Sequence, residues 1–254
     1  MAQTAPRTAI ITGGAKRIGK ALVQGLAEVG WAVAIHYGAS SDDAQALADE
    51  INASGGKATT VQCDLASPHV ADTIMSAVHK DLGPADLLIN SASLFEDDDA
   101  QTVSSDSFDA HMAVNLRAPV LLASTFAKQL PDGVDGNIIN LIDQRVWRLN
   151  PRFLSYTTSK SALWTVTQTL AQSLAPRIRV NGIGPGPTMG NDRQTPEDFA
   201  AQASAVPLER GPDIAEFQRA VRFILETPSL TGQMLALDGG QHLAWETPDA
   251  TGKE

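Results

Sequence analysis

The chain has 254 residues, of which 43% are hydrophobic, so it can bury the core of one large α/β domain or two small ones. Its formal net charge of -10 argues against nucleic acid or an anionic membrane as a partner. The single cysteine, Cys63, excludes an internal disulfide bond, and with neither a signal-like segment before the first predicted strand nor an apolar run of membrane-spanning length, we expect a cytoplasmic protein.

Short β-type runs alternate with longer helical patterns along the chain. The predicted strands are residues 8–12, 31–37, 57–62, 86–90, 137–142, 178–183 and 233–237. The predicted helices are residues 18–30, 42–54, 68–82, 107–130, 155–175 and 213–226. Strands that alternate with helices pair in parallel through right-handed crossovers. The order therefore predicts an α/β protein: a single doubly wound (Rossmann) domain over residues 1–254 with a seven-stranded parallel sheet.

A glycine-containing loop, residues 13–19, joins the first predicted strand to the first predicted helix. Backbone N–H groups and the helix dipole at such a junction attract a phosphate group. We therefore expect Gly13 and Gly19 to shape a nucleotide site. The strict G-x-G-x-x-G spacing is absent, which leaves a purely structural turn as the alternative.

The residues after the second predicted strand bear on the choice of cofactor. Residues 36–41 include no carboxylate that would bind ribose hydroxyls and repel a 2′-phosphate, and the first acid is Asp42. Lys16 and Arg17 supply positive charge nearby. We therefore expect NADP(H) rather than NAD(H), with a solvated basic pair as the alternative interpretation of Lys16 and Arg17.

Three residues suited to proton transfer follow the fifth predicted strand. Asp143 stands at its end, where open α/β sheets bind ligands. Tyr156 and Lys160 are four residues apart, so on a helix they share one face. A nearby cation lowers the pKa of a phenol from about 10, typically by roughly 1–3 units, towards neutral pH. The alternatives are a structural strand-end cap and a packed ring beside a solvated ammonium.

The longest irregular stretch, residues 184–212, contains five prolines. A loop of that length in a compact domain is usually functional, so we expect a substrate lid there, with a short helix at 195–203. The chain after Gly240 is short, and we expect residues 246–254 to be disordered.

Several short motifs follow one another in a specific order along nearly the whole chain. They are Thr12-Gly13, Arg17, Gly19, Asn90-Ser-Ala92, Asn115, Tyr156-x-x-x-Lys160, residues 181–186 and Asp238-Gly-Gly240. This set resembles the short-chain dehydrogenase/reductase family. Where that family usually has glycine and serine, this chain has Arg17 and Asp143. These departures, together with His36-Tyr37 and Ala92-Ser-Leu-Phe95, resemble the pteridine reductase branch, which includes the dihydromonapterin reductases.

The resemblance implies a role for each matching residue. The catalytic residues would be Asn115, Asp143, Tyr156 and Lys160, with Asn115 holding a water that links Lys160 to solvent. The cofactor NADP(H) would contact Gly13, Lys16, Arg17, Ile18, Gly19, His36, Tyr37, Ser40, Asp64, Leu65, Asn90, Ala92, Ser93, Tyr156, Lys160, Pro185, Gly186 and Thr188. The substrate would contact Arg17, Ser93, Phe95, Asp143 and Tyr156, with Phe95 stacking on a pterin ring. Ordinary core packing is the alternative for Phe95, and a satisfied buried amide is the alternative for Asn115.

The resemblance further implies NADPH-dependent reduction of a C=N bond in a pterin, dihydropterin or dihydrofolate, with a proton delivered through Asp143 or Tyr156. An ionised carboxylate cannot donate a hydrogen bond and repels a developing alkoxide, so Asp143 suits a ring nitrogen better than a ketone. The alternatives are a short-chain carbonyl reductase or alcohol dehydrogenase with a non-pterin substrate, and a non-catalytic NADP-binding scaffold. We expect no metal site, and the acidic run 96–99 reads as a solvated surface turn.

Two predicted helices, 107–130 and 155–175, correspond to those that the family buries between subunits. The second is apolar over more than one stripe, and a helix that is apolar around much of its surface needs a second cover. We therefore expect a homotetramer, with a dimer as the fallback, and residues 241–245 near a neighbouring subunit's site. The only other expected partner is a small pterin-like substrate.

Overall fold

The computed structural model describes residues 7–190 and 194–246 of the chain. Its centre is a sheet of seven parallel strands in the order β3-β2-β1-β4-β5-β6-β7. The strands are β1 (Thr8–Thr12), β2 (Ala32–Tyr37), β3 (Lys57–Gln62), β4 (Leu87–Asn90), β5 (Gly136–Leu141), β6 (Ile178–Pro185) and β7 (Met234–Leu237). The strand order changes direction between β1 and β4, so the predicted doubly wound seven-stranded sheet is confirmed.

The central strands β1, β4 and β5 are buried throughout because helices cover both faces of the sheet. Ile10 and Ile11 are neighbours on β1 and point to opposite faces, yet both are fully buried, as are Leu88 and Ile89 on β4. The edge strand β3 is different, since most of its residues keep some exposure. The middle of the sheet therefore lies in a core from which water is excluded, and the loops begin at the strand ends.

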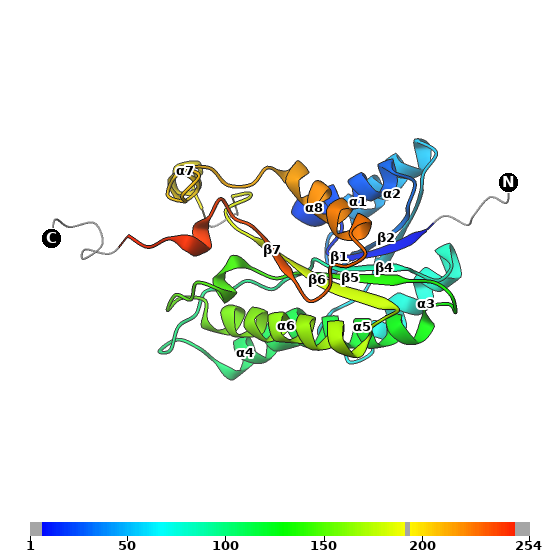
Figure 1. Cartoon of the computed structure of the whole chain (residues 1–254), viewed down its shortest axis with the longest axis horizontal. Coiled ribbons are helices and arrows are strands. Elements are labelled where there is room, and N and C mark those ends of the chain that lie inside the picture. The colour runs from blue at the N-terminus through cyan, green and yellow to red at the C-terminus, as the bar shows by residue number, and fades with distance from the viewer. Residues whose placement is uncertain (1–6, 191–193, 247–254) are drawn as a thin grey trace.

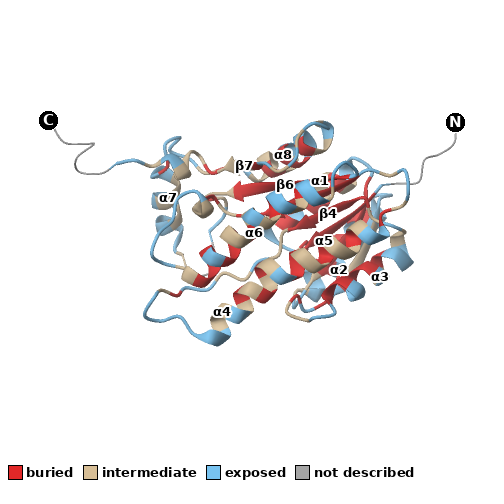
Figure 2. Ribbon diagram, turned by 60° about the horizontal axis from the view of Figure 1, so that its bottom comes forward, coloured by how far each residue is buried: buried red, intermediate tan, exposed pale blue. Residues whose placement is uncertain are grey.

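The helices form one layer on each side of the sheet (Figure 1). One layer consists of α1 (Arg17–Glu28), α2 (Ser41–Ala53) and α8 (Ile214–Glu226). The other contains α3 (Val70–Leu82), α4 (Ser105–Met112), α5 (Ala118–Gln129) and α6 (Leu154–Ser173). Figure 2 shows buried residues on the strands and on the inner sides of these helices. No helix in the described part of the chain is both long and apolar enough to cross a membrane.

The predicted helix 107–130 contains a break in its regular winding. After α4 the chain makes a π-helical turn, η1 (Ala113–Arg117), before α5 begins. Such turns often occur at functional sites, and here the turn holds Asn115 fully buried. The prediction of one regular α-helix is therefore wrong in this segment, because a hydrophobic period near 3.6 residues does not report one locally widened turn.

The segment predicted as a lid begins within β6, which continues two residues beyond its predicted end to Pro185. The short helix predicted at 195–203 is present as α7 (Pro196–Ser204). A capping box between Thr195 and Asp198 satisfies backbone donors at its start, and none of its residues is buried. Residues 191–193 of the predicted lid and 247–254 of the predicted disordered tail lie outside the described residues.

Candidate active site

The loop after β1 comes close to the backbone at the end of β4. Gly13 has a φ of +63°, and a Cβ added there would lie 2.9 Å from the Cα of Ala92. A Cβ added at Gly19 would collide with the carbonyl oxygen of Gly13. Arg17, at the position where the family usually has glycine, adopts a left-handed φ of 52°, while Ile18 packs against the core. The predicted phosphate loop is therefore a tight strand–turn–helix junction.

His36 supports this loop from the neighbouring strand. The backbone N–H of Gly13 donates to its Nδ1 at 3.2 Å, and its Nε2 lies 3.0 Å from the carbonyl oxygen of Cys63. These contacts require a neutral ring that accepts at Nδ1 and donates at Nε2. Burial lowers the pKa of His36, which favours that neutral form. In this structure the two hydrogen bonds of His36 support the loop. The direct cofactor contact predicted for His36 stays a prediction.

The two cations of the loop have different partners. Arg17 donates to the carbonyl oxygens of Gly190 at 2.7 Å and Met189 at 3.0 Å, so it joins the loop after β1 to the segment predicted as a lid. The ammonium of Lys16 lies 3.0 Å from the carboxylate of Asp43, and both side chains are about half exposed. An exposed pair of this kind is weak, so Lys16 can exchange Asp43 for a phosphate at little cost.

Buried hydrogen bonds fix the ends of β1, β4 and β5 relative to one another. The Thr12 hydroxyl accepts from the backbone N–H groups of Ser91 at 3.0 Å and Ala92 at 3.2 Å. Asn90 donates to the side-chain oxygen of Asn140 at 2.8 Å. The Asn90-Ser-Ala92 motif thus serves to align three strand ends beneath the site.

Asn115 fastens the segment that follows β4. Its oxygen accepts from the Ser93 hydroxyl at 3.2 Å and from the Leu94 N–H at 2.8 Å. Its amide donates to the Leu94 carbonyl at 2.9 Å and to the Ser159 hydroxyl at 3.0 Å. All four hydrogen-bonding positions of the side chain are used, which matches the alternative of a satisfied buried amide. The water relay predicted for Asn115 stays a prediction.

The remaining residues predicted to contact the cofactor lie at the same edge of the sheet. Tyr37 ends β2, Ser40 precedes α2, and the Asp64 carboxylate accepts from the N–H of Ala66 in the turn after β3, at 2.8 Å. Leu65 is buried in the core, so it offers little surface to a ligand.

The last predicted cofactor contacts lie at the end of β6 and in the segment that follows it. Pro185 is the last residue of β6, and the Thr188 hydroxyl donates to the Gly186 carbonyl at 3.1 Å. A Cβ added at Gly186 would lie 2.5 Å from the Cα of Asp238, so only glycine fits this crossing.

Asp143 and Tyr156 are directly hydrogen-bonded. Asp143 follows β5 and precedes the short 3-10 turn η2 (Gln144–Val146), where its Oδ1 accepts from the N–H of Arg145 at 2.8 Å. The Tyr156 hydroxyl, in the first turns of α6, donates to Oδ2 of Asp143 at 2.8 Å. The structure therefore brings together two of the residues that the sequence predicted as a proton-handling site.

Burial is the largest cause of the pKa shifts of Asp143, Tyr156 and Lys160. It raises the pKa of Asp143, although the N–H and charge of Arg145 oppose the shift. Burial and the Asp143 carboxylate both raise the pKa of Tyr156 well above its usual value. Burial lowers the pKa of Lys160 to about 8, and its ammonium donates to the carbonyl oxygen of Leu141 at 2.7 Å. The expected lowering of the Tyr156 pKa is therefore wrong in this structure, because burial and the bonded Asp143 carboxylate both raise it while the Lys160 ammonium is bonded to the Leu141 carbonyl.

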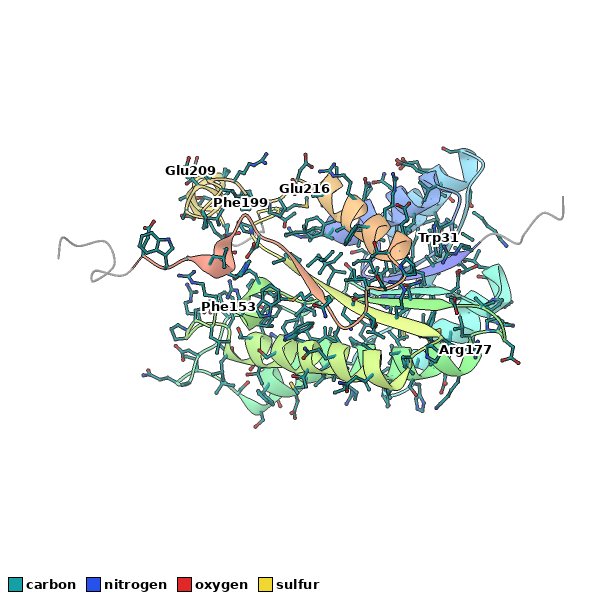
Figure 3. The ribbon with its side chains drawn as sticks, in the orientation of Figure 1. Trp31, Phe153, Arg177, Phe199, Glu209 and Glu216 are labelled. Carbon is teal, nitrogen blue, oxygen red and sulfur yellow. The ribbon has the colours of Figure 1, made fainter. Side chains whose placement is uncertain are left out.

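An aromatic cluster borders the acid. Phe95 stacks on Phe153, with ring centroids 4.4 Å apart, and meets the Tyr156 ring edge-on at 4.6 Å. The guanidinium of Arg145 lies 4.7 Å from the Phe153 centroid. The Ser93 hydroxyl is close enough to Tyr156 to lower its pKa slightly against the larger effects. Figure 3 shows Phe153 at the end of the molecule that also bears the lid.

Sequence reasoning missed three residues of this region. Arg145 and Phe153 stand two residues after Asp143 and three before Tyr156, and that proximity along the chain is the signal that could have indicated them. The third is Asp98, which is 5% exposed and whose carboxylate accepts from both the N–H and the hydroxyl of Ser155. The reading of residues 96–99 as a solvated turn is therefore wrong for Asp98. It caps the start of α6, where Phe153 in a left-handed conformation offers no side-chain cap.

In the described residues, no group of three or more histidine, cysteine, aspartate or glutamate side chains could hold a metal ion. The site instead contains a phenol, a carboxyl, an ammonium and a guanidinium. Such a set can bind, orient and protonate an organic substrate.

Comparison with known proteins agrees with this geometry. Residues 7–198 match the family model for short chain dehydrogenase. The crystal structure of FolM alternative dihydrofolate reductase 1 from Brucella canis, complexed with NADP, superposes with a TM-score of 0.94 at 53% identity, covering 96% of this chain and 97% of that one. The structure of a blue fluorescent protein from a metagenomic library, in complex with NADPH, is 31% identical with a TM-score of 0.85, covering 92% of this chain and 97% of that one.

A curated relative has a different activity in its name. The 3-oxoacyl-[acyl-carrier-protein] reductase of Synechocystis sp. is 29% identical over 92% of this chain and 96% of its own length. The predicted family is confirmed, and the similarity to FolM confirms the resemblance to the pteridine reductase branch. This chain belongs to the short-chain dehydrogenase/reductase family of oxidoreductases.

Proposed function

We propose that the protein reduces a C=N bond of a pterin, dihydropterin or dihydrofolate with NADPH. The observation that carries the proposal is the 2.8 Å hydrogen bond between the Tyr156 hydroxyl and Oδ2 of Asp143. Asp143 stands where the family usually has a serine that donates to a carbonyl. Reduction of a C=N bond needs a proton at nitrogen, and a buried carboxyl with a raised pKa suits that need.

The residues around the glycine loop fit a dinucleotide phosphate. A Cβ at Gly19 would collide with the Gly13 carbonyl, so the loop folds tightly on itself at the start of α1, and a strand–turn–helix junction of this kind supports the proposed pyrophosphate site. The absence of a carboxylate from residues 36–41 favours NADP(H), as does the NADP bound to the FolM relative. Lys160 would hold the nicotinamide ribose. When bound, NADPH supplies the hydride.

Proton delivery falls to the bonded pair Asp143 and Tyr156. Either group can protonate the substrate nitrogen, and the 2.8 Å bond between them lets the other group replace the lost proton. Phe95 and Phe153 stack on each other beside the Tyr156 ring, so a heteroaromatic substrate would bind against this aromatic cluster. Ser93 and Arg17 stand at the same edge of the sheet, where they can contact polar groups of the ring.

The test is NADPH oxidation by the purified protein with quinonoid dihydropterin, dihydrobiopterin, dihydromonapterin and dihydrofolate in parallel. Since general acid catalysis typically contributes 10²–10⁴-fold, we expect pterin turnover that falls about 100-fold or more in Asp143→Ser. Asp106→Ser, an exchange of an exposed acid on α4, should behave like the wild type.

Ketones and a 3-oxoacyl thioester belong in the same panel because of the 3-oxoacyl reductase relative. Turnover of those carbonyl compounds without any pterin turnover would refute the pterin substrate and favour a carbonyl reductase. If NADPH is not oxidised with any member of the panel, the scaffold alternative gains support.

We also propose that the protein works as a homotetramer in the cytoplasm. Trp164, Val166 and Leu170 of α6 are partly exposed, although Trp164 and Leu170 also pack against buried residues. The lone cysteine, Cys63, agrees with a reducing compartment.

A further inference from the structure

Arg145 lies beside the proposed proton path and has no part in the function proposed above. Its guanidinium carbon is 4.7 Å from the ring centroid of Phe153 and 5.4 Å from that of Phe95. Its Nε lies 4.0 Å from Oδ1 of Asp143, and both of these side chains are only 17% exposed. Two aromatic rings thus hold a cation against the carboxyl group.

The carboxyl group of Asp143 is divided between two partners. Oδ1 accepts from the backbone N–H of Arg145 and faces its guanidinium, whereas Oδ2 accepts from the phenol of Tyr156. The charged and titratable groups that face Asp143 are Arg145 from η2 and Tyr156 and Lys160 from α6. The Lys160 ammonium is directed to the Leu141 carbonyl, so Arg145 is the cation directed at the carboxyl.

We propose that Arg145 is a positioning residue for the reduction: its guanidinium orients the Asp143 carboxyl towards Tyr156 and sets how readily that carboxyl takes up a proton. The proposal deepens the proposed function and rests on it, because Asp143 must handle the proton for Arg145 to matter in catalysis. Arg145 itself keeps its charge throughout, since a guanidinium does not deprotonate in proteins.

Packing alone does not account for the choice of arginine. Nη1 of Arg145 is buried and has no hydrogen-bond partner among the described residues, which costs stability. A methionine could cover the same two rings without that cost, since a thioether packs well against aromatic faces. It could not supply a positive charge at Oδ1. The protein therefore retains an arginine with an unpaired buried N–H group at this position. What arginine supplies there, and methionine does not, is a positive charge beside Asp143.

Two variants separate charge from packing. Arg145→Met keeps an unbranched side chain against Phe95 and Phe153 but removes the cation. Arg145→Lys keeps the cation with a different head group. If the methionine variant does not fold, Arg145→Gln replaces it as the neutral member of the pair.

The readout is a fluorine signal that does not depend on turnover. The chain has two tyrosines, so incorporation of 3-fluorotyrosine gives two ¹⁹F resonances, and a Tyr37→Phe variant assigns the one from Tyr156. Because the phenol is bonded to Asp143, its chemical shift follows the titration of that carboxyl. Asp143→Asn should abolish the titration step and so confirms its origin.

We expect the midpoint of this step to rise by about one pH unit or more in Arg145→Met, a tenfold gain in proton affinity, and to stay near the wild-type value in Arg145→Lys. The corresponding limb of the kcat profile against pH, measured with NADPH and a dihydropterin substrate, should move in the same direction. An unchanged midpoint in Arg145→Met, with only a lower melting temperature, would overturn the proposal and leave Arg145 as a packing residue. A shifted midpoint in an enzyme that turns over no pterin would refute the proposed function while upholding the effect of Arg145 on Asp143.

Discussion

Three ionisable residues of the active site are each buried, and burial shifts their pKa values in the direction that favours the neutral form. The pKa of Asp143 and of Tyr156 is raised, and that of Lys160 is lowered to about 8. The attraction between Asp143 and Lys160 opposes both of their shifts without reversing them. Groups with proton affinities perturbed in this way are common where a protein transfers protons.

The lowered pKa of Lys160 predicts a pH dependence of stability. Between pH 8 and 10.5 the unfolded chain binds a proton at this lysine that the folded protein has begun to lose. The free energy of unfolding should therefore rise with pH across this window, by at most about 3 kcal/mol. Urea unfolding at several pH values would measure the slope, and Lys160→Met should remove that contribution. Equal slopes in the two proteins would contradict the assignment of a lowered pKa to Lys160.

Single residues also mark where sequence reasoning succeeds. The proximity of Asp143 and Tyr156 was predictable from residue type and spacing, whereas the water relay predicted for Asn115 stays a prediction. Asp98 and Phe153 were not found. Asp98 lies 57 residues from the Ser155 that it caps, and nothing local distinguishes a buried acid from the exposed acids beside it. Phe153 owes its place to a left-handed backbone that a sequence pattern does not report.

At the scale of secondary structure, the first turn of α6 decides where Tyr156 lies. That turn begins after Phe153, which has no side-chain cap, and Asp98 supplies the missing acceptor from a separate loop. The carboxylate also favours this end of the helix through the helix dipole. The loop that carries Phe95 and the helix that carries Tyr156 are thereby joined through one buried acid.

Removal of this cap should weaken both stability and catalysis. In Asp98→Ala the N–H of Ser155 loses its acceptor, so we expect a loss of about 1–3 kcal/mol in the free energy of unfolding, together with a lower kcat. The matched control is Asp97→Ala, where the neighbouring acid is 44% exposed and pairs with the exposed Arg152. That exchange should cost less than about 1 kcal/mol. Equal losses in the two variants, measured by chemical unfolding, would argue against a capping role for Asp98.

The secondary structure was predictable in segments where the apolar residues recur at one regular spacing. The strands β1 and β3 have the predicted limits, since strongly β-prone runs are bounded by turn residues. The π turn η1 was not predictable, because it changes the hydrogen-bond spacing without changing the apolar pattern around it. The extension of β6 to Pro185 depends on pairing with β7, which is a contact between distant parts of the chain.

At the scale of the whole molecule, the site is assembled from loops at one edge of the sheet. The predicted phosphate loop follows β1, the Phe95 segment follows β4, Asp143 follows β5, and most of the predicted lid follows β6. The parallel sheet brings these segments together even though they are far apart in the sequence. The helices α4, α5 and α6 belong to the layer on one side of the sheet, and Figure 2 shows intermediate and exposed residues along their outer sides.

The proposed tetramer makes the outer face of α6 an interface, and a single exchange can test it. Ala162 is half-buried on that face, so Ala162→Arg would place a charged side chain between subunits without disturbing the core. We expect the variant to form smaller assemblies than the wild type in size-exclusion chromatography with light scattering. Ala46→Arg introduces the same charge on the exposed side of α2, in the opposite layer, and should leave the assembly unchanged. A monomeric wild-type protein would refute the interface. An Ala162→Arg protein whose assembly has the same mass as that of the wild type would also refute it, because an interface does not tolerate a buried unpaired charge.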